Sequence, residues 1–154
     1  MSAQQGIDPR GPRFSAGITA VLLLIVIGLN LAGATVASTI LFAVITAIFA
    51  WGAFAGVQRH PYGLLFKKLV RPRLKPPTEL EDPIPPTFAQ GVGFVITLGG
   101  LVLGLLGVPY AIAVAAGLAF IAAFLNSVFA YCLGCQIYLL LVRAGVLGRK
   151  SSTA

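Results

Sequence analysis

Four uncharged apolar windows occupy most of the 154-residue chain. They cover residues 14–33, 35–57, 88–107 and 109–130. Each window has at least 20 residues, and roughly 20 helical residues cross the ~30 Å hydrocarbon core of a bilayer. Because a backbone inside lipid must satisfy its own hydrogen bonds, helices are the expected solution. We therefore predict an all-α membrane protein with four transmembrane helices, forming one integral-membrane domain over residues 1–154.

All 11 lysine and arginine residues lie outside these windows. Two precede the first window, six lie in the central loop 58–87 and three follow the last window, whereas the two short connections carry none. Since cationic flanks stay on the cytoplasmic side, both the N- and C-termini and the central loop are predicted to be cytoplasmic, in a multi-pass protein of the cytoplasmic membrane. The same clustering explains the net charge of +7 by contact with the lipid bilayer, and it argues against nucleic acid as a partner.

Two segments of the sequence repeat. Residues 8–17 and 82–91 share the pattern D-P-x-x-P-x-F-x-x-G, 74 positions apart, and each leads into an odd-numbered window. Residues 60–71 and 132–143 match more loosely, with an offset of 72, and both end in Leu-Val-Arg. Convergence is the alternative, because proline suits the first turn of a helix and aromatic residues suit the membrane interface. We favour duplication, which gives two parallel two-helix repeats.

The segments after the even-numbered windows are predicted to form short interfacial helices on the cytoplasmic side. Residues 62–70 place leucines against two lysines, as in a helix lying in the interface. After the fourth window, a break near Ala130 is preferred to one continuous helix over 109–142, which at roughly 50 Å would exceed the ~30 Å core. Six prolines within residues 71–86 predict a stiff, extended strap, which is either a linker or a docking surface for a soluble partner.

The only two cysteines, Cys132 and Cys135, form a C-x-x-C pair. Simple packing is one interpretation, since free cysteine is often buried and inert. A permanent disulfide is disfavoured because the cytoplasm is reducing, and haem attachment requires a histidine where Gln136 stands. A closed zinc site requires four ligands, whereas His60 is the one further histidine or cysteine. No metal site is therefore assigned within the chain.

Redox or sulfur-transfer chemistry is the favoured interpretation of the pair. A helix N-terminus and cations such as Arg143 favour the reactive thiolate. Cys132 would begin the helix and act as the nucleophile, and Cys135, three residues later, would resolve the mixed disulfide. His60 is a candidate base if the equivalent ends of the two repeats meet. The sequence does not define a cofactor.

Several of these motifs occur together in one known family. They are the segments 7–14, 71–74, 79–83, 88–90 and 132–135, which read IDPRGPRF, RPRL, ELEDP, FAQ and CLGC. With these motifs the chain resembles, over nearly its whole length, a bacterial membrane family of unknown function common in actinobacteria (the DUF family four-three-nine-five). The resemblance implies that the protein is encoded near thioredoxin-like proteins and sulfurtransferases, which would fit thiol or sulfur chemistry. It brings no established activity or cofactor.

Together these observations predict a membrane thiol-disulfide or sulfur-relay component. It would use Cys132 and Cys135 with a soluble thioredoxin-like protein or sulfurtransferase docked on the 71–86 loop. A non-enzymatic membrane scaffold or assembly subunit, in which the cysteines only pack, is the competing function. A small carrier of a sulfur species or a metal is the third.

Overall fold

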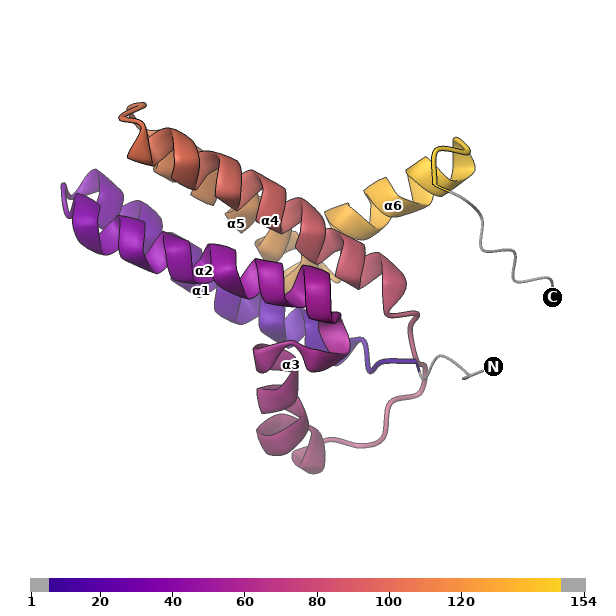
Figure 1. Ribbon diagram of the computed structural model, residues 1–154. Coiled ribbons are helices and arrows are strands. Elements are labelled where there is room, and N and C mark those ends of the chain that lie inside the picture. The colour runs from indigo at the N-terminus through magenta and orange to yellow at the C-terminus, as the bar shows by residue number, and fades with distance from the viewer. Residues whose placement is uncertain (1–5, 148–154) are drawn as a thin grey trace.

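A computed structural model describes residues 6–147 and shows helices joined by short connections (Figure 1). Four helices are long and apolar enough to cross a membrane: α1 (Arg10–Leu31), α2 (Thr35–Ala55), α4 (Ile84–Leu105) and α5 (Ala111–Phe129). Shorter segments follow α2 and α5: η1 (Val57–Arg59), α3 (Pro61–Leu65), η2 (Phe66–Val70), η3 (Arg71–Arg73) and α6 (Leu133–Arg143). The structure confirms the predicted all-α fold.

The first residues of α1 and α4 lie earlier in the sequence than predicted. Both helices begin four residues before the predicted windows, at Arg10 and Ile84, because prolines occupy their first turns, where a fixed φ and a missing N–H are tolerated. The extended strap was therefore predicted too long. Residues 84–86 belong to α4, residues 71–73 form a 3₁₀ turn, and only residues 74–83 lie outside helices.

The four long helices pack as two antiparallel hairpins whose connecting turns lie at the same end of the bundle (Figure 1). Between the hairpins, α1 packs on α5 and α2 packs on α4. Leu23, Val26, Phe42 and Ile45 fill the centre, against small alanines of α5. Many other large apolar side chains are exposed, Phe54 at 81% for example. An apolar outer surface of this kind is expected where helices meet lipid.

The first turns of α1 and α4 are built alike. The Asp8 carboxylate accepts the N–H of Arg10 at 3.0 Å, and the Asp82 carboxylate accepts the N–H of Ile84 at 2.9 Å. Each aspartate thus satisfies one of the free N–H groups at the start of a helix. The two aspartates are equivalent in the D-P-x-x-P pattern, so the sequence repeat is also a repeat of hydrogen bonds.

The short helices are anchored in equivalent ways as well. Phe14 of α1 contacts Phe66 of η2 with ring centroids 5.7 Å apart, and Phe88 of α4 contacts Tyr138 of α6 at 5.5 Å. Phe14 and Phe88 are equivalent in the stronger sequence match, and Phe66 and Tyr138 in the weaker one. Both matches therefore correspond to tertiary contacts, as expected for two parallel two-helix repeats.

Both even-numbered spans end at a residue with positive φ. Gly56 follows α2 with a φ of 87°, and Ala130 follows α5 with a φ of 55°. A residue in the left-handed region commonly ends an α-helix. The fourth span is therefore interrupted before Cys132, as predicted, and α6 leaves the bundle as a separate helix (Figure 1).

Candidate thiol site

Cys132 and Cys135 lie at the start of α6. Cys132 is the N-cap residue, and its Sγ accepts the N–H of Cys135 at 3.2 Å. The two Sγ atoms are joined as a disulfide, with Cα atoms 5.2 Å apart, inside the usual range of about 4.4–6.8 Å. Both residues are half-buried. The first turn of α6 therefore holds the two sulfurs within reach of each other and near the surface.

Gly134, between the cysteines, sets the position of the pair on the bundle. It is buried against Ala89 of α4, and a Cβ added at residue 134 would collide with the Cα and Cβ of Ala89. Tyr138, one turn further along α6, contacts Phe88, which also belongs to α4. The start of α6 is thus fixed on α4 by a close backbone approach that only glycine permits.

The electrostatic setting of the pair comes from its helix. The first turn of α6 contains no acidic residue, and the free N–H groups of a helix N-terminus favour a thiolate at this position. Arg143 lies in the last turn of α6, roughly 15 Å from its start at 1.5 Å per residue. Arg143 is therefore too distant to contact the thiols, contrary to the expectation from its place in the sequence.

His60 holds the corresponding place at the start of α3. It is the N-cap residue, and its Nδ1 accepts the N–H of Tyr62 at 3.2 Å, which places the proton of the neutral imidazole on Nε2. The residue is 3% exposed, and burial lowers its pKa from 6.5 to about 4. His60 is therefore neutral at physiological pH and serves as a helix cap.

The structure does not join His60 to the cysteines. Within residues 6–147, no hydrogen bond or ring contact of His60 reaches either of them. The ring lies beside Gly52 of α2, where an added Cβ would be 2.8 Å from both His60 and Gln90 of α4. Gln90 of α4 lies on the side of His60, whereas Ala89 lies on the side of α6. Because consecutive helix residues do not share a face, His60 and Cys132 lie on different sides of α4.

His60 and Cys132 are nevertheless counterparts in the two repeats. They align in the weaker sequence match, and each caps the short helix that follows an even-numbered span. The sequence-based prediction placed His60 and Cys132 in one reacting group, whereas in the structure they occupy equivalent positions of the two repeats. The alignment of residues 60–71 with 132–143 already contained this signal.

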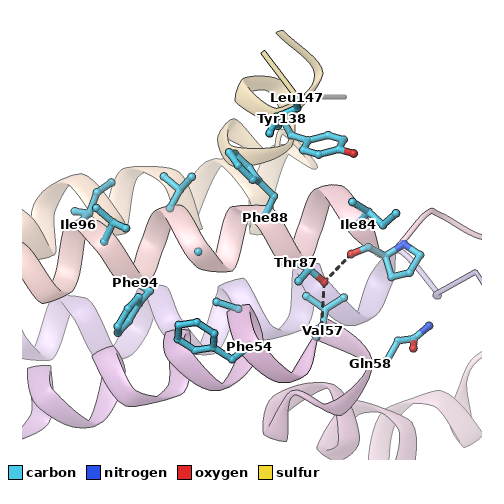
Figure 2. A pocket seen from close by; sticks show the side chains of 16 residues that line it. Phe54, Val57, Gln58, Ile84, Thr87, Phe88, Phe94, Ile96, Tyr138 and Leu147 are labelled. Atoms are coloured by element: carbon cyan, nitrogen blue, oxygen red, sulfur yellow. Dashed lines mark hydrogen bonds between the residues drawn. The ribbon is translucent and has the colours of Figure 1, made fainter. Parts of the chain in front are cut away.

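A groove with a volume of about 910 Å³ opens beside α6, between α2 and α4 (Figure 2). The aromatic side chains in its walls are Phe54, Phe88, Phe94 and Tyr138. The Thr87 hydroxyl in the wall already has partners, since it accepts the N–H of Val57 at 3.3 Å and donates to the Pro83 carbonyl at 2.7 Å. The uncharged lining suits a lipid chain or another apolar molecule. No sequence motif indicated this groove, because its walls come from three separate helices.

The described part of the chain, residues 6–147, contains no candidate metal centre. No group of three or more histidine, cysteine or acidic residues lies together there. Structural zinc almost always takes four such ligands. The cysteine pair and His60, on different sides of α4, do not assemble into one ligand set.

The strap is fastened to the N-terminal segment. Ile7 and Glu81 exchange two backbone hydrogen bonds, at 2.8 and 2.9 Å. The Arg10 guanidinium donates to the carbonyl of Lys75 at 2.9 Å. Residues 76–80, between these attachments, are mostly exposed. The strap therefore presents an accessible loop that is held at both ends.

Comparison with known proteins identifies the family of the chain but assigns it no function. No curated protein and no solved structure matches the chain. The model of a family described as a domain of unknown function (DUF4395) matches residues 7–143, which is most of the chain. The resemblance seen in the motifs is thereby confirmed, and the chain belongs to the DUF4395 family.

Proposed function

We propose that the protein is a membrane thiol-disulfide or sulfur-relay component with Cys132 and Cys135 as its reactive pair. The observation that carries this function is the placement of the pair at the N-terminus of α6, half-buried, with the Sγ of Cys132 accepting the N–H of Cys135. A helix N-terminus is the setting that makes a cysteine reactive. Packing alone does not explain why the Sγ of Cys132 caps the helix that carries the second cysteine.

The proposed exchange needs only the pair and a thiol partner. The Cys132 thiolate attacks a partner disulfide, a mixed disulfide forms and the first partner thiolate leaves. The Cys135 thiolate then attacks the Sγ of Cys132, which closes the internal disulfide and releases the second partner thiolate, so two electrons have passed to the partner. In sulfur transfer, the Cys132 thiolate takes the outer sulfur of a partner persulfide, and the partner cysteine leaves as a thiolate.

A soluble thioredoxin-like protein or sulfurtransferase is the proposed partner, docking on the exposed residues 76–80 of the predicted 71–86 loop. Support comes from the exposure of residues 76–80 and from the attachment of both ends of this stretch. Replacing residues 76–80 by an equally long Gly/Ser segment is expected to leave membrane insertion intact and to abolish co-purification of the partner. Unchanged co-purification would reduce the strap to a spacer.

The distribution of cations supports a topology with both termini and the 58–87 loop in the cytoplasm. In a background without the native cysteines, a cysteine at Ala34 or Val108, in the connecting turns, should react with an impermeant maleimide added to intact cells. A cysteine at Thr78 should stay unlabelled until the cells are opened. Labelling at residue 78 in intact cells would contradict this topology.

The relay is tested by the reduction potential and reactivity of the pair in the purified protein. Redox buffers of graded composition give the potential, and the pH dependence of alkylation gives the thiol pKa. We expect a reversible couple within the range of known thiol-disulfide oxidoreductases, about −270 to −120 mV, and one thiol more acidic than free cysteine. Two thiols that alkylate slowly and do not form a reversible couple would favour the scaffold.

A further inference from the structure

The chain after α2 carries a group of exposed cations in residues 59–75, here called the basic segment. They are Arg59, Lys67, Lys68, Arg71, Arg73 and Lys75. The ion pair described within residues 6–147 joins Arg10 to Asp8, so none of these six cations forms an ion pair there, although Arg71 lies near enough to the Asp8 carboxylate to help lower its pKa. We propose that the basic segment binds anionic phospholipid headgroups of the membrane that the bundle crosses.

The basic segment has three distinct sides. Phe66 is 3% exposed and packs on the ring of Phe14, which docks one side on α1. Leu65 and Leu69, four residues apart and so on one face, form a second side and are 41% and 57% exposed. Lys67 and Lys68 lie between these two leucines in the sequence and are both exposed. A docked side, an apolar edge and a cationic side are the features of a helix that lies in the membrane interface.

The basic segment cannot leave the membrane boundary. The second span ends at Ala55, and the first cation, Arg59, follows four residues later. The contact of Phe66 with α1 ties the middle of the segment to the same end of the bundle (Figure 1). Here the leucine edge reaches the acyl boundary while the cations meet phosphates at an anionic surface. An acidic soluble protein would match the cations and leave the leucine edge without a partner.

The repeat offers an internal comparison. Helix α6 occupies the position equivalent to α3 and η2, and it also exposes apolar side chains, Ile137 and Leu140, at 41% and 60%. It contains a single cation, Arg143. Anionic lipid is therefore expected at the basic segment and not at α6.

The test titrates the full chain in neutral detergent with short-chain phosphatidylglycerol or phosphatidylcholine while hydrogen exchange of residues 61–75 is followed. Protection is expected with phosphatidylglycerol only. In Lys67→Gln/Lys68→Gln, half-maximal protection should need roughly ten- to thirtyfold more anionic lipid, since two cations are lost. Lys67→Arg/Lys68→Arg keeps the charge and should titrate like the parent protein.

Two controls separate lipid binding from misfolding and from a general charge effect. Exchange within α4 and α5 should be the same in all variants, and Arg143→Gln should leave the titration of residues 61–75 unchanged. Equal protection by the two lipids, or an unchanged midpoint in Lys67→Gln/Lys68→Gln, would overturn the proposal. Protection that requires an added acidic protein would assign the surface to that partner instead. The outcome does not depend on the state of the cysteines, so it is distinguishable from the relay test.

Discussion

The two repeats share one frame and differ in the residue that caps the short helix after the second span of each. His60 caps α3 through Nδ1, is 3% exposed and is neutral. Cys132 caps α6 through Sγ and is half-buried beside a second cysteine. In each repeat, a short helix therefore begins in the same way shortly after the second span, α3 after α2 and α6 after α5. The two positions therefore differ in the capping residue and its exposure rather than in the fold, and only the second carries the thiols proposed to react.

A second pair of equivalent positions shows the same independence of geometry from chemistry. Thr87, at the start of α4, accepts the N–H of Val57 at the end of α2. Its counterpart at the start of α1 is Arg13, whose guanidinium donates to the carbonyl of Ser127 at the end of α5, at 3.4 Å. Both bonds tie the entry of one helix to the exit of its neighbour, but the direction of donation is reversed. Duplicated positions can therefore keep a structural task while their side chains change completely.

Exchanging the caps for serine breaks the comparison most directly. Cys132→Ser should abolish thiol exchange, because serine forms no disulfide. His60→Ser keeps a hydroxyl that caps a helix and should leave exchange unchanged. Cys135→Ser should trap a mixed disulfide with the partner under mild oxidation, since the resolving thiol is gone. Gel electrophoresis without reductant and a partner-reduction assay measure these outcomes.

Two results would contradict this assignment. Loss of exchange in His60→Ser, at unchanged stability, would give the histidine a role as base despite its separation from the pair. A functional Cys132→Ser together with no trapped adduct in Cys135→Ser would leave the scaffold as the better function.

Acid should weaken the first repeat through His60. Burial lowers the His60 pKa from 6.5 to about 4, so between these values the unfolded chain binds a proton that the folded chain does not. The free energy of unfolding is expected to be constant above pH 6.5 and to fall as the pH drops, by about 3 kcal/mol near pH 4 at 1.36 kcal/mol per pKa unit. Chemical unfolding in detergent across this range measures it. In His60→Ser the decline should disappear, and an identical decline in both proteins would refute the assignment.

Adding one methyl group at the glycine of the pair should disturb the second repeat alone. Gly134→Ala places a Cβ onto the backbone of Ala89, and overpacking of this kind costs about 1–3 kcal/mol. Gly117→Ala in α5 is the matched control, since its Cβ meets no atom within 4 Å and alanine is favoured over glycine in a helix by about 0.5–1 kcal/mol. Thermal unfolding and alkylation of the cysteines report the two effects. Equal stability of both variants would mean that α6 is not fixed on α4 as described.

The smallest difference is expected between the two aspartates that precede α1 and α4 and accept an N–H of the first turn. Asp8→Ala should cost about 1–2 kcal/mol, and Asp82→Ala, at an exposed residue without an ion pair in the described part of the chain, about 0.5–1 kcal/mol. The hydrogen bonds from Arg10 hold the pKa of Asp8 below its ordinary 3.8. The Asp8 contribution is therefore complete above pH 3.8 and is lost as the pH falls through the lower folded-state pKa. Unfolding of the two alanine variants between neutral pH and pH 3 measures both effects, and a larger cost for Asp82→Ala would reverse the comparison.

The membrane fold was readable from the sequence because length and charge act locally. Uninterrupted apolar windows and their cationic borders need no tertiary information to be recognised. The helix starts at Arg10 and Ile84 were missed because proline is compatible both with an extended strap and with a first helical turn. What decided between them was the aspartate that precedes each turn, whose carboxylate meets the N–H two residues later.

The candidate site was predictable in part. The C-x-x-C motif and the break before it identified Cys132 as the start of a helix. The contact of Gly134 with Ala89, the burial of His60 and the groove beside Tyr138 depend on how separate helices meet, which no local pattern encodes. The distance of Arg143 from the pair follows from helical rise alone and was open to prediction once α6 was accepted as one helix.

The attachments of the strap bear on how tightly the proposed soluble partner would bind. Ordering a free backbone residue costs about 1–2 kcal/mol of entropy, and a loose strap would lose that free energy at the moment of docking. The bonds of Glu81 to Ile7 and of Lys75 to Arg10 impose part of this order during folding, before any partner arrives. Removing the bond to Lys75, as in Arg10→Gln, is expected to weaken docking of the proposed partner although none of the residues 76–80 has changed.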